Sequence, residues 1–572
     1  MSDPPSRFAS TAPWVTGLLL AIPVFVAYYP PMTDLGYHEA AIGLLRHWDD
    51  PVRVPKGLYV LNLGEPNQLF HMAGWGMSYL VSTRWAVKLL VAAGVAAVPI
   101  AAARFARHVG ASPLAALVVA PMALGWLFTW GLVANLLGVS ALLAVLPLAD
   151  RLAREPSVGR AVQGFGALVL LYFAHMAMMV VFAGIALGLA VLHPLSWRKT
   201  ALRVSPFAGG VALTFAQLGL QRPFLSPAVK GFPRLWEPLT RKLAEVPDFI
   251  LPATDGVVQI AMLALCLLCV SMFFWLRRLE RRAEALPAPV AGRGLDRARS
   301  RALTFRWELV AAAGFAAYLA FPLSLNGATF VYHRWFPPSF AVLTIVAAPR
   351  SLKARAARVA RVAACALPVA ALFAAWPSFA DSNRQYQRLE RLIPLVEPGS
   401  ALAELDLGPG DPSRTYSLGP AYGRILATRG GRLEYAFTDS SISPVFLRAR
   451  YQWNESLVRI AFDSWKFMPS HDLRRFRYVL IRTRDPVLQW EASYVLAREA
   501  RVVAQEGEWI LLESKLPVVS LLSPDVPLET PPPETMRQRV QSFIDAWRAS
   551  QGGAPPSAPP AAPTGSDASS PP

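Results

Sequence analysis

The polar residues that could carry chemistry lie in four short stretches beside apolar runs. The first stretch, Thr33-Asp-Leu-Gly-Tyr-His-Glu39, places two carboxylates and an imidazole just after an apolar segment. If this stretch is helical, Asp34 and His38 are four residues apart and share a face, so the carboxylate can orient the imidazole. Asp34 and Glu39 are then the candidate catalytic bases. A solvated amphipathic helix explains the same residues equally well.

The other three stretches offer aromatic surfaces and positive charge. Two tryptophans four residues apart serve either as interfacial anchors or as a wall for an acyl chain or sugar. A lone histidine inside an apolar run is more often a hydrogen-bonded structural group than a ligand. An arginine before a later apolar run either holds a phosphate or lies at the head-group level. The predicted substrate-binding residues are His38, Trp126, Trp130, His175, His333 and Arg334.

Transmembrane helices are the elements that must position these residues. Of the 572 residues 54% are hydrophobic and 16% are charged, and the mean hydropathy is +0.34, which is unlike a soluble protein of this length. The apolar runs predict about 11 crossings, from an uncleaved first span at 14–29 to a last span at 362–379. The run 161–193 would be about 50 Å long as one helix, so we expect a break at His175.

Charge asymmetry between alternate loops predicts the orientation. With the N-terminus inside, the cytoplasmic loops and residues 1–13 hold 23 Lys and Arg against 6 acidic residues, and the opposite loops hold 10 against 9. This is the positive-inside bias, and it predicts an N-in, C-out protein of the inner (plasma) membrane. The apolar stretch 69–80 would reverse every later loop as a crossing, so we expect it to be interfacial or re-entrant on the outer side.

The chain after the last span changes character twice. Residues 1–380 are the predicted transmembrane domain, and 381–519 are a small extracytoplasmic α/β domain with a strand at 478–483 and a hairpin around Glu506-Gly507. Residues 520–572 are rich in Pro, Ala and Ser and predict a disordered tail with one short helix at 536–548. The fold class is therefore mainly α, a polytopic helical membrane protein with one small α/β domain.

Two other functional classes fit the composition poorly. The formal net charge of +18 could indicate nucleic acid, but the arginines cluster between apolar runs, where membrane topology explains them. We therefore expect no nucleic-acid partner. Cys266 and Cys269 have the C-x-x-C spacing but lie with Cys365 inside apolar runs, so they read as small core residues and not as a redox or zinc pair.

With these residues placed, the sequence resembles the C-type (GT-C) membrane glycosyltransferases. Members of this family have many spans, use polyprenyl-phosphate-linked sugars and carry an acidic residue in the first extracytoplasmic loop, which Asp34 matches. The resemblance extends to the turn Trp-Gly…Asn135-Leu-Leu-Gly, to His175 opening a span, to Arg334 near the start of a late span and to a C-terminal α/β domain. The adjacent acidic pair of several members is absent, because Leu35 follows Asp34.

The resemblance implies a hexosyl- or pentosyltransferase that moves a sugar from a polyprenyl-phosphate-linked donor to an extracytoplasmic glycan, lipid or protein. Asp34 would be the base for the acceptor hydroxyl, or a ligand to a divalent cation such as Mg²⁺ or Mn²⁺. Arg334 and His333 would hold the donor phosphate, and His38, Glu39 and His175 would be supporting polar groups. The membrane would supply the donor laterally.

Three alternatives stay open from the sequence. One is a non-catalytic assembly or scaffold protein of the cell envelope, since a fold can persist without chemistry. Another is a ligase or polymerase of lipid-linked glycans, with a cationic site in the outer loop 220–255 formed by Arg222, Lys230, Arg234, Arg241 and Lys242. A transporter fits less well, because the charges are largely confined to loops and the spans show no internal repeat.

Overall fold

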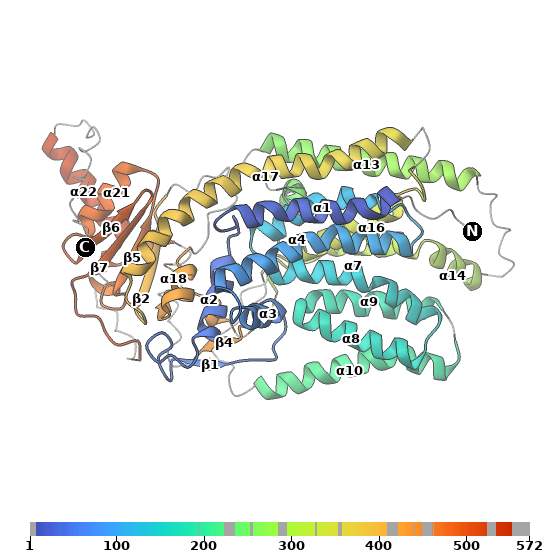
Figure 1. Cartoon of the computed structure of the whole chain (residues 1–572), viewed down its shortest axis with the longest axis horizontal. Coiled ribbons are helices and arrows are strands. Elements are labelled where there is room, and N and C mark those ends of the chain that lie inside the picture. The colour runs from blue at the N-terminus through green and yellow to red at the C-terminus, as the bar shows by residue number, and fades with distance from the viewer. Residues whose placement is uncertain are drawn as a thin grey trace.

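Apolar helices that lie roughly side by side form most of the molecule (Figure 1). The structure is a computed structural model that describes residues 7–193, 195–221, 235–251, 256–283, 294–325, 329–352, 357–408, 421–440, 442–448, 460, 463–522 and 534–551. Within these ranges, five helices are long and apolar enough to cross a membrane: α1 (Arg7–Val26), α4 (Thr83–His108), α7 (Val133–Arg154), α13 (Gly256–Ala283) and α17 (Arg358–Leu392).

The other predicted spans correspond to shorter or less apolar helices. These are α5 (Ala115–Val119) with the 3₁₀ segment η1 (Ala120–Leu124), then α8 (Val158–Ala174), α9 (Met176–Leu192), α10 (Trp197–Gln221), α15 (Arg306–Ala320) and α16 (Phe336–Ala347). The predicted break at His175 is confirmed, because α8 ends at Ala174 and α9 begins at Met176. Cys266 and Cys269 are buried within α13. The count of 11 crossings stays a prediction.

The two ends of the helical bundle differ in what they carry. The segments after α1, namely α2 (Leu35–Arg46), β1 (Tyr59–Leu61) and α3 (Leu69–Met77), lie at the end that also carries the sheet. The start of α1 and the basic helix α14 (Leu295–Thr304) lie at the opposite end (Figure 1). α3 has nine residues and is only about 14 Å long, too short to cross a bilayer, as expected of an interfacial segment.

A five-stranded mixed sheet forms the C-terminal part, in the order β3-β2-β5-β7-β6. Its strands are β2 (Ala401–Asp406), β3 (Arg432–Leu433), β5 (Tyr478–Arg482), β6 (Ala500–Glu506) and β7 (Trp509–Ser514). β2 is parallel to β3 and β5, and the other pairs are antiparallel. The predicted strand at 478–483 and the hairpin around Glu506-Gly507 are both present.

The two faces of this sheet belong to two different cores. Because successive side chains of a strand point to opposite faces, Tyr478 and Leu480 join the core of the helical bundle, whereas Val479 and Ile481 form a separate small core. α17 continues past residue 380 and covers the first face, where the Trp509 indole N–H donates to the Gln385 carbonyl over 3.1 Å. The predicted boundary at 380/381 therefore falls within a continuous helix.

The second face is covered by α21 (Pro486–Leu496) and by α22 (Met536–Gln551). Met536 and Val540 of α22 are buried in the small core, and Phe543 contacts Trp490 of α21 with ring centroids 5.4 Å apart. The helix predicted at 536–548 is thus present, and it packs against the sheet. The flanking residues 523–533 and 552–572 of the predicted tail lie outside the described residues.

The first outer stretch and the C-terminal part also fold together. β1 pairs antiparallel with β4 (Val445–Leu447), so that Tyr59 lies opposite Leu447, and α2 packs on α18 (Gly423–Arg429). In Figure 1 the blue ribbon of α2 lies beside the orange ribbon of α18. Segments from the two ends of the chain therefore surround the first candidate residues.

Candidate functional site

Asp34 lies at the junction between the helical bundle and the C-terminal part. It directly precedes α2, and its backbone N–H donates to the Trp130 carbonyl over 3.1 Å, while the Thr33 N–H donates to the Thr129 carbonyl over 2.7 Å. The side chain of Asp34 is half-buried, and its carboxylate has no hydrogen-bond or ion-pair partner among the described residues. Burial raises the pKa of Asp34 to about 7. An unpaired carboxyl with this pKa suits a general base.

A glycine makes this junction possible. Gly131 has φ +74°, and a methyl group on its Cα would lie 2.5 Å from the backbone nitrogen of Asp34. A side chain at position 131 would therefore both strain the backbone and push Asp34 away. The Trp-Gly turn noted in the sequence is thus the surface against which Asp34 is placed.

His38 is turned away from the partner expected for it. Its Nδ1 lies 2.9 Å from Nε2 of His71 on α3, and its ring packs against Phe70 and Phe437. Burial lowers the pKa of both imidazoles, that of His71 to about 4. The two histidines are therefore neutral at pH 7, and the predicted contact in which Asp34 orients the His38 imidazole is absent from the contacts of the described residues.

Glu39 is fully buried in a polar contact between three parts of the molecule. Its Oε1 accepts from the Arg424 guanidinium over 2.6 Å and from the Thr83 hydroxyl over 2.9 Å. Asp34 is therefore the carboxylate of this stretch that is open to a substrate, and Glu39 is held in an ion pair.

The loop that contains Trp126 and Trp130 contacts the residues around Arg334. Trp126, in α6 (Trp126–Thr129), stacks on the His333 ring with centroids 4.4 Å apart, and Trp130 contacts Phe330 at 4.8 Å. Since the Trp130 carbonyl also accepts from the Asp34 N–H, this loop connects Asp34 to the segment 330–334. The structure thus brings candidate residues from three distant stretches around one loop.

Arg334 carries a positive charge that has no counter-ion among the residues that the structure describes. It lies in the 3₁₀ segment η2 (Tyr332–Trp335), and one of its nitrogens donates to the Thr329 carbonyl over 3.0 Å. No carboxylate lies within 4.0 Å of its guanidinium among the described residues, and its Nε is buried without a partner there. Burial lowers the pKa of Arg334 to about 10, so the group stays charged at neutral pH. A half-buried guanidinium that has no carboxylate beside it in the described part of the chain favours an anionic ligand.

Two further buried polar groups lie near this region. His175 is close enough to Arg334 to feel its charge, and its Nδ1 is buried without a partner in the described part of the chain. Asn135 lies one turn before Gly138, whose Cα faces the His175 side chain, and both polar atoms of its buried amide lack partners there. Buried polar groups are normally hydrogen-bonded, so these atoms are available to a ligand.

His333 has a partner of its own. Its Nε2 lies 3.1 Å from Oε2 of Glu245, which also accepts from the Tyr332 hydroxyl over 2.5 Å. This contact fixes the ring on which Trp126 stacks. His333 therefore supports the aromatic loop, and Arg334 is the group of the pair that is free to bind an anion.

The cationic site considered for the outer loop 220–255 is only partly described. Lys242 donates to the carbonyls of Leu319 and Phe321, and Arg241 pairs with Glu237 and Glu245. Both cations are therefore engaged within the protein. Arg222, Lys230 and Arg234 lie outside the described residues.

A candidate metal centre does not form around Asp34 in the described residues. No group of three or more His, Cys, Asp and Glu side chains there has an arrangement that could hold a metal ion. The role of Asp34 as a ligand to a divalent cation stays a prediction.

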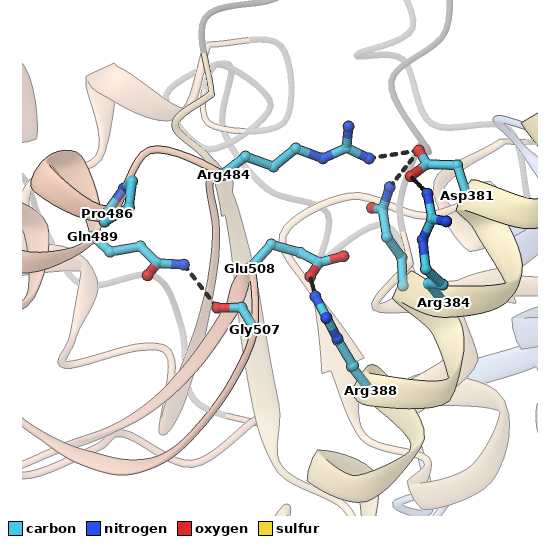
Figure 2. A pocket seen from close by; sticks show the side chains of 9 residues that line it. Asp381, Arg384, Arg388, Arg484, Pro486, Gln489, Gly507 and Glu508 are labelled. Atoms are coloured by element: carbon cyan, nitrogen blue, oxygen red, sulfur yellow. Dashed lines mark hydrogen bonds and ion pairs between the residues drawn. The ribbon is translucent and has the colours of Figure 1, made fainter. Parts of the chain in front are cut away.

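A separate pocket lies where α17 meets the sheet (Figure 2). It has a volume of about 370 Å³, and its charged lining consists of Arg384, Arg388, Arg484, Asp381 and Glu508. Arg388 pairs with Glu508 at 2.6 Å and Arg484 with Asp381 at 2.5 Å, which ties the helix to the strand ends. These ion pairs hold α17 against the sheet, so the pocket lies at a structural contact between the two.

Comparison with known proteins finds similarity at the level of structure. No protein-family model matches the chain, and no curated protein matches it. Two crystal structures of ArnT from Cupriavidus metallidurans are similar to it. The apo structure has 13% identity and a TM-score of 0.48 over 88% of this chain and 97% of ArnT. The structure bound to undecaprenyl phosphate has 12% identity and a TM-score of 0.49 over 89% and 98%.

Sequence reasoning missed several residues around the site. His71 lies in a stretch read only as interfacial, and the Gly131 turn was noted without its contact to Asp34. Arg424 gives no signal in the sequence, because its partner Glu39 lies 385 residues away. Only the fold brings these residues to Asp34.

Proposed function

We propose that this chain is a membrane glycosyltransferase that moves a sugar from a polyprenyl-phosphate-linked donor to an acceptor outside the cytoplasm. The observation that carries the proposal is the placement of Asp34 and Arg334 on either side of one aromatic loop, each without an ion-pair partner among the described residues. The first suits a base and the second suits a phosphate. The loop between them offers Trp130 as an aromatic surface of the kind that sugars stack on.

The chemistry follows from these two groups. Asp34 takes the proton from an acceptor hydroxyl, whose oxygen then forms a bond to the anomeric carbon of the donor sugar. The bond from that carbon to the phosphate oxygen breaks and its electron pair stays on the phosphate. The polyprenyl phosphate that leaves carries one more negative charge, and Arg334 stabilises it. Asp34 then releases its proton to solvent.

The neighbouring groups have supporting roles in this proposal. Asn135 and His175 provide hydrogen bonds beside the phosphate, and the stack of Trp126 on His333 holds the loop. We further infer from the loop charges that the chain lies in the inner membrane with its N-terminus inside and the sheet outside. A donor carried in the membrane would then reach the site from the side, and the acceptor from outside.

Two substitutions test the proposal. Asp34→Asn keeps the size of the side chain and removes the base, so it should abolish transfer while insertion and folding persist. Arg334→Ala should weaken binding of undecaprenyl phosphate by about 10- to 100-fold, through the loss of a charge-assisted contact of about 1.5–3 kcal/mol. Transfer is measured with the purified protein and isolated lipid-linked sugars, and binding by titration with undecaprenyl phosphate.

Control variants make the result specific. Arg388→Ala removes a partly exposed arginine of the Figure 2 pocket and should leave binding of undecaprenyl phosphate unchanged. If Asp34→Asn transfers sugar at the wild-type rate, Asp34 is not the base. If wild type transfers no lipid-linked sugar while a deletion strain loses an envelope glycan, the chain is a non-catalytic assembly or scaffold protein and not an enzyme.

A further inference from the structure

The helix α2 begins directly after Asp34 and packs on the C-terminal part through the face opposite Asp34. At about 100° per residue, Gly36, Glu39 and Gly43 lie on one face of α2, and Asp34, His38 and Ile42 lie on the other. The contacts agree with this division. The first face meets α18, while His38 and Ile42 meet His71 and Gly74 of α3.

Small residues let α2 and α18 touch backbone to backbone. A methyl group on Gly423 would lie 2.3 Å from the Gly36 carbonyl carbon, and one on Gly43 would lie 2.3 Å from the Ala427 carbonyl oxygen. Two such contacts, two turns apart on α2, fix both the distance and the crossing of the helices. Any larger side chain at Gly423 must therefore push α2 away from α18.

A buried ion pair locks this contact. The Arg424 side chain is 9% exposed, and its guanidinium lies 2.6 Å from Glu39 of α2 and 3.1 Å from Glu390 of α17. The hydroxyls of Tyr37 and Tyr422 lie 2.5 Å apart beside it. Arg424 thus joins α2, α17 and α18 through one planar group, a geometry that lysine cannot reproduce.

Asp34 is consequently held from two sides. On the side of the bundle, the amides of Thr33 and Asp34 donate to the carbonyls of Thr129 and Trp130. On the other side, α18 fixes the helix that begins one residue later. A shift of α2 relative to α18 would move Asp34 relative to the Trp130 loop, and with it relative to Arg334.

We propose that Arg424 and Glu39 are positioning residues of the transferase: their ion pair clamps α2 between the C-terminal part and the aromatic loop, and so sets where Asp34 meets the acceptor. This rests on the proposed function, and it assigns Glu39 a role distinct from that of a base. It also makes the C-terminal part a component of the active site.

The test compares two double variants that each neutralise a buried ion pair. Glu39→Gln/Arg424→Gln removes the clamp and leaves no fully buried charge, because Glu390, the other partner of Arg424, is 33% exposed. Glu499→Gln/Arg539→Gln is the matched control, because Arg539 of α22 pairs with Glu499 at 3.0 Å on the far face of the sheet. Gly423→Ala keeps both charges of the clamp and displaces α2 by steric contact alone.

The clamp variant should lose about 10- to 100-fold in kcat, the effect of a displacement near 1 Å, with the KM for the donor and the affinity for undecaprenyl phosphate unchanged. The acid limb of its pH–rate profile should move to lower pH, as Asp34 gains contact with water. Gly423→Ala should change in the same direction, Arg424→Lys should keep more activity than the clamp variant, and the control pair should match wild type. A kcat within twofold of wild type in the clamp variant overturns the proposal.

Hydrogen exchange separates this proposal from the proposed function. In the clamp variant the amides of Thr33 and Asp34 should exchange at least about tenfold faster than in wild type, and in the control pair they should not. Unchanged exchange overturns the clamp whatever the activity. If wild type transfers no sugar, the proposed function fails, while faster exchange still supports the placement of Asp34 by Arg424.

Discussion

Two aspartates near opposite ends of α7 have opposite surroundings. Asp150, near its C-terminal end, is fully buried and has three partners at 2.5–3.0 Å, which are the His108 imidazole and the guanidinium groups of Arg154 and Arg306. Asp34, beside the loop that leads into the first turn, is half-buried and has no partner among the described residues. Asp150 joins α4, α7 and α15, so its charge stabilises the contact between these helices. Asp34 is also held in a fixed position, but it has no partner among the described residues, so its carboxyl is available for chemistry.

The largest difference between the two aspartates should appear in activity. Asp34→Asn should lower the transfer rate by about 10²- to 10⁴-fold, the usual contribution of a general base. Asp150→Asn should keep the transfer rate per folded molecule within about tenfold, because it lies at the other end of the bundle. Initial rates, corrected for the folded fraction by size-exclusion chromatography, measure both. Equal losses of activity in the two variants would show that Asp34 contributes no more to catalysis than Asp150 does.

Stability should show the reverse order. Asp150→Asn leaves the guanidinium groups of Arg154 and Arg306 without their anion and should reduce the free energy of unfolding by about 2–3 kcal/mol, less than for a fully buried pair because Arg154 is 43% exposed. Thermal unfolding in detergent at pH 7 measures the change. A variant as stable as wild type would mean that the two guanidinium groups are solvated well enough without Asp150.

The pH dependence of transfer sharpens the contrast. Burial raises the pKa of Asp34 to about 7, and only the ionised carboxyl accepts a proton. The rate kcat/KM should therefore be highest above pH 7 and fall about tenfold for each pH unit below it. A rate that stays flat down to pH 5 would show that a group with an ordinary carboxyl pKa, or none, is the base.

The last effect expected is that the Asp34→Asn variant is more stable than wild type at alkaline pH. Since the folded protein raises the pKa of Asp34, the folded state binds this proton more tightly than the unfolded state. The energetic cost of ionising Asp34 is absent below pH 4, grows as the pH rises and is complete above pH 7. Asp34→Asn should therefore unfold at a higher temperature than wild type at pH 8 and at the same temperature at pH 4.

Periodicity and breaks in the sequence were enough to predict much of the fold. The apolar runs, the interruption at His175 and the hairpin around Gly507 are local signals, and each appears in the structure where it was expected. α22 was also predicted from one apolar face, although its packing on α21 was not. Local patterns fix elements well because they depend on neighbours in the chain.

The surroundings of the candidate residues could not be predicted in the same way. Asp34 and His38 share a helix face, but His71 comes from another helix and takes the imidazole. From the sequence Glu39 is a second candidate base, but in the structure it forms an ion pair with Arg424. That no described carboxylate lies beside Arg334 depends on all the segments that pack around it. Such facts depend on contacts between distant segments, which no periodicity in one sequence encodes.

The contact between α2 and α18 also constrains how the protein is made. The partners Glu39 and Arg424 are 385 residues apart, and at roughly 5–20 residues per second the ribosome adds the second about 20–80 s after the first. During that time α2 has left the ribosome, but α18, the helix that contacts its Gly36, Glu39 and Gly43, has not yet been synthesised. A nascent chain cut short before residue 424 would have most of its predicted membrane helices and yet lack the part that finishes the first loop. Completion of the site is therefore a late event of synthesis, and no chain that ends before residue 424 can carry a fully formed site.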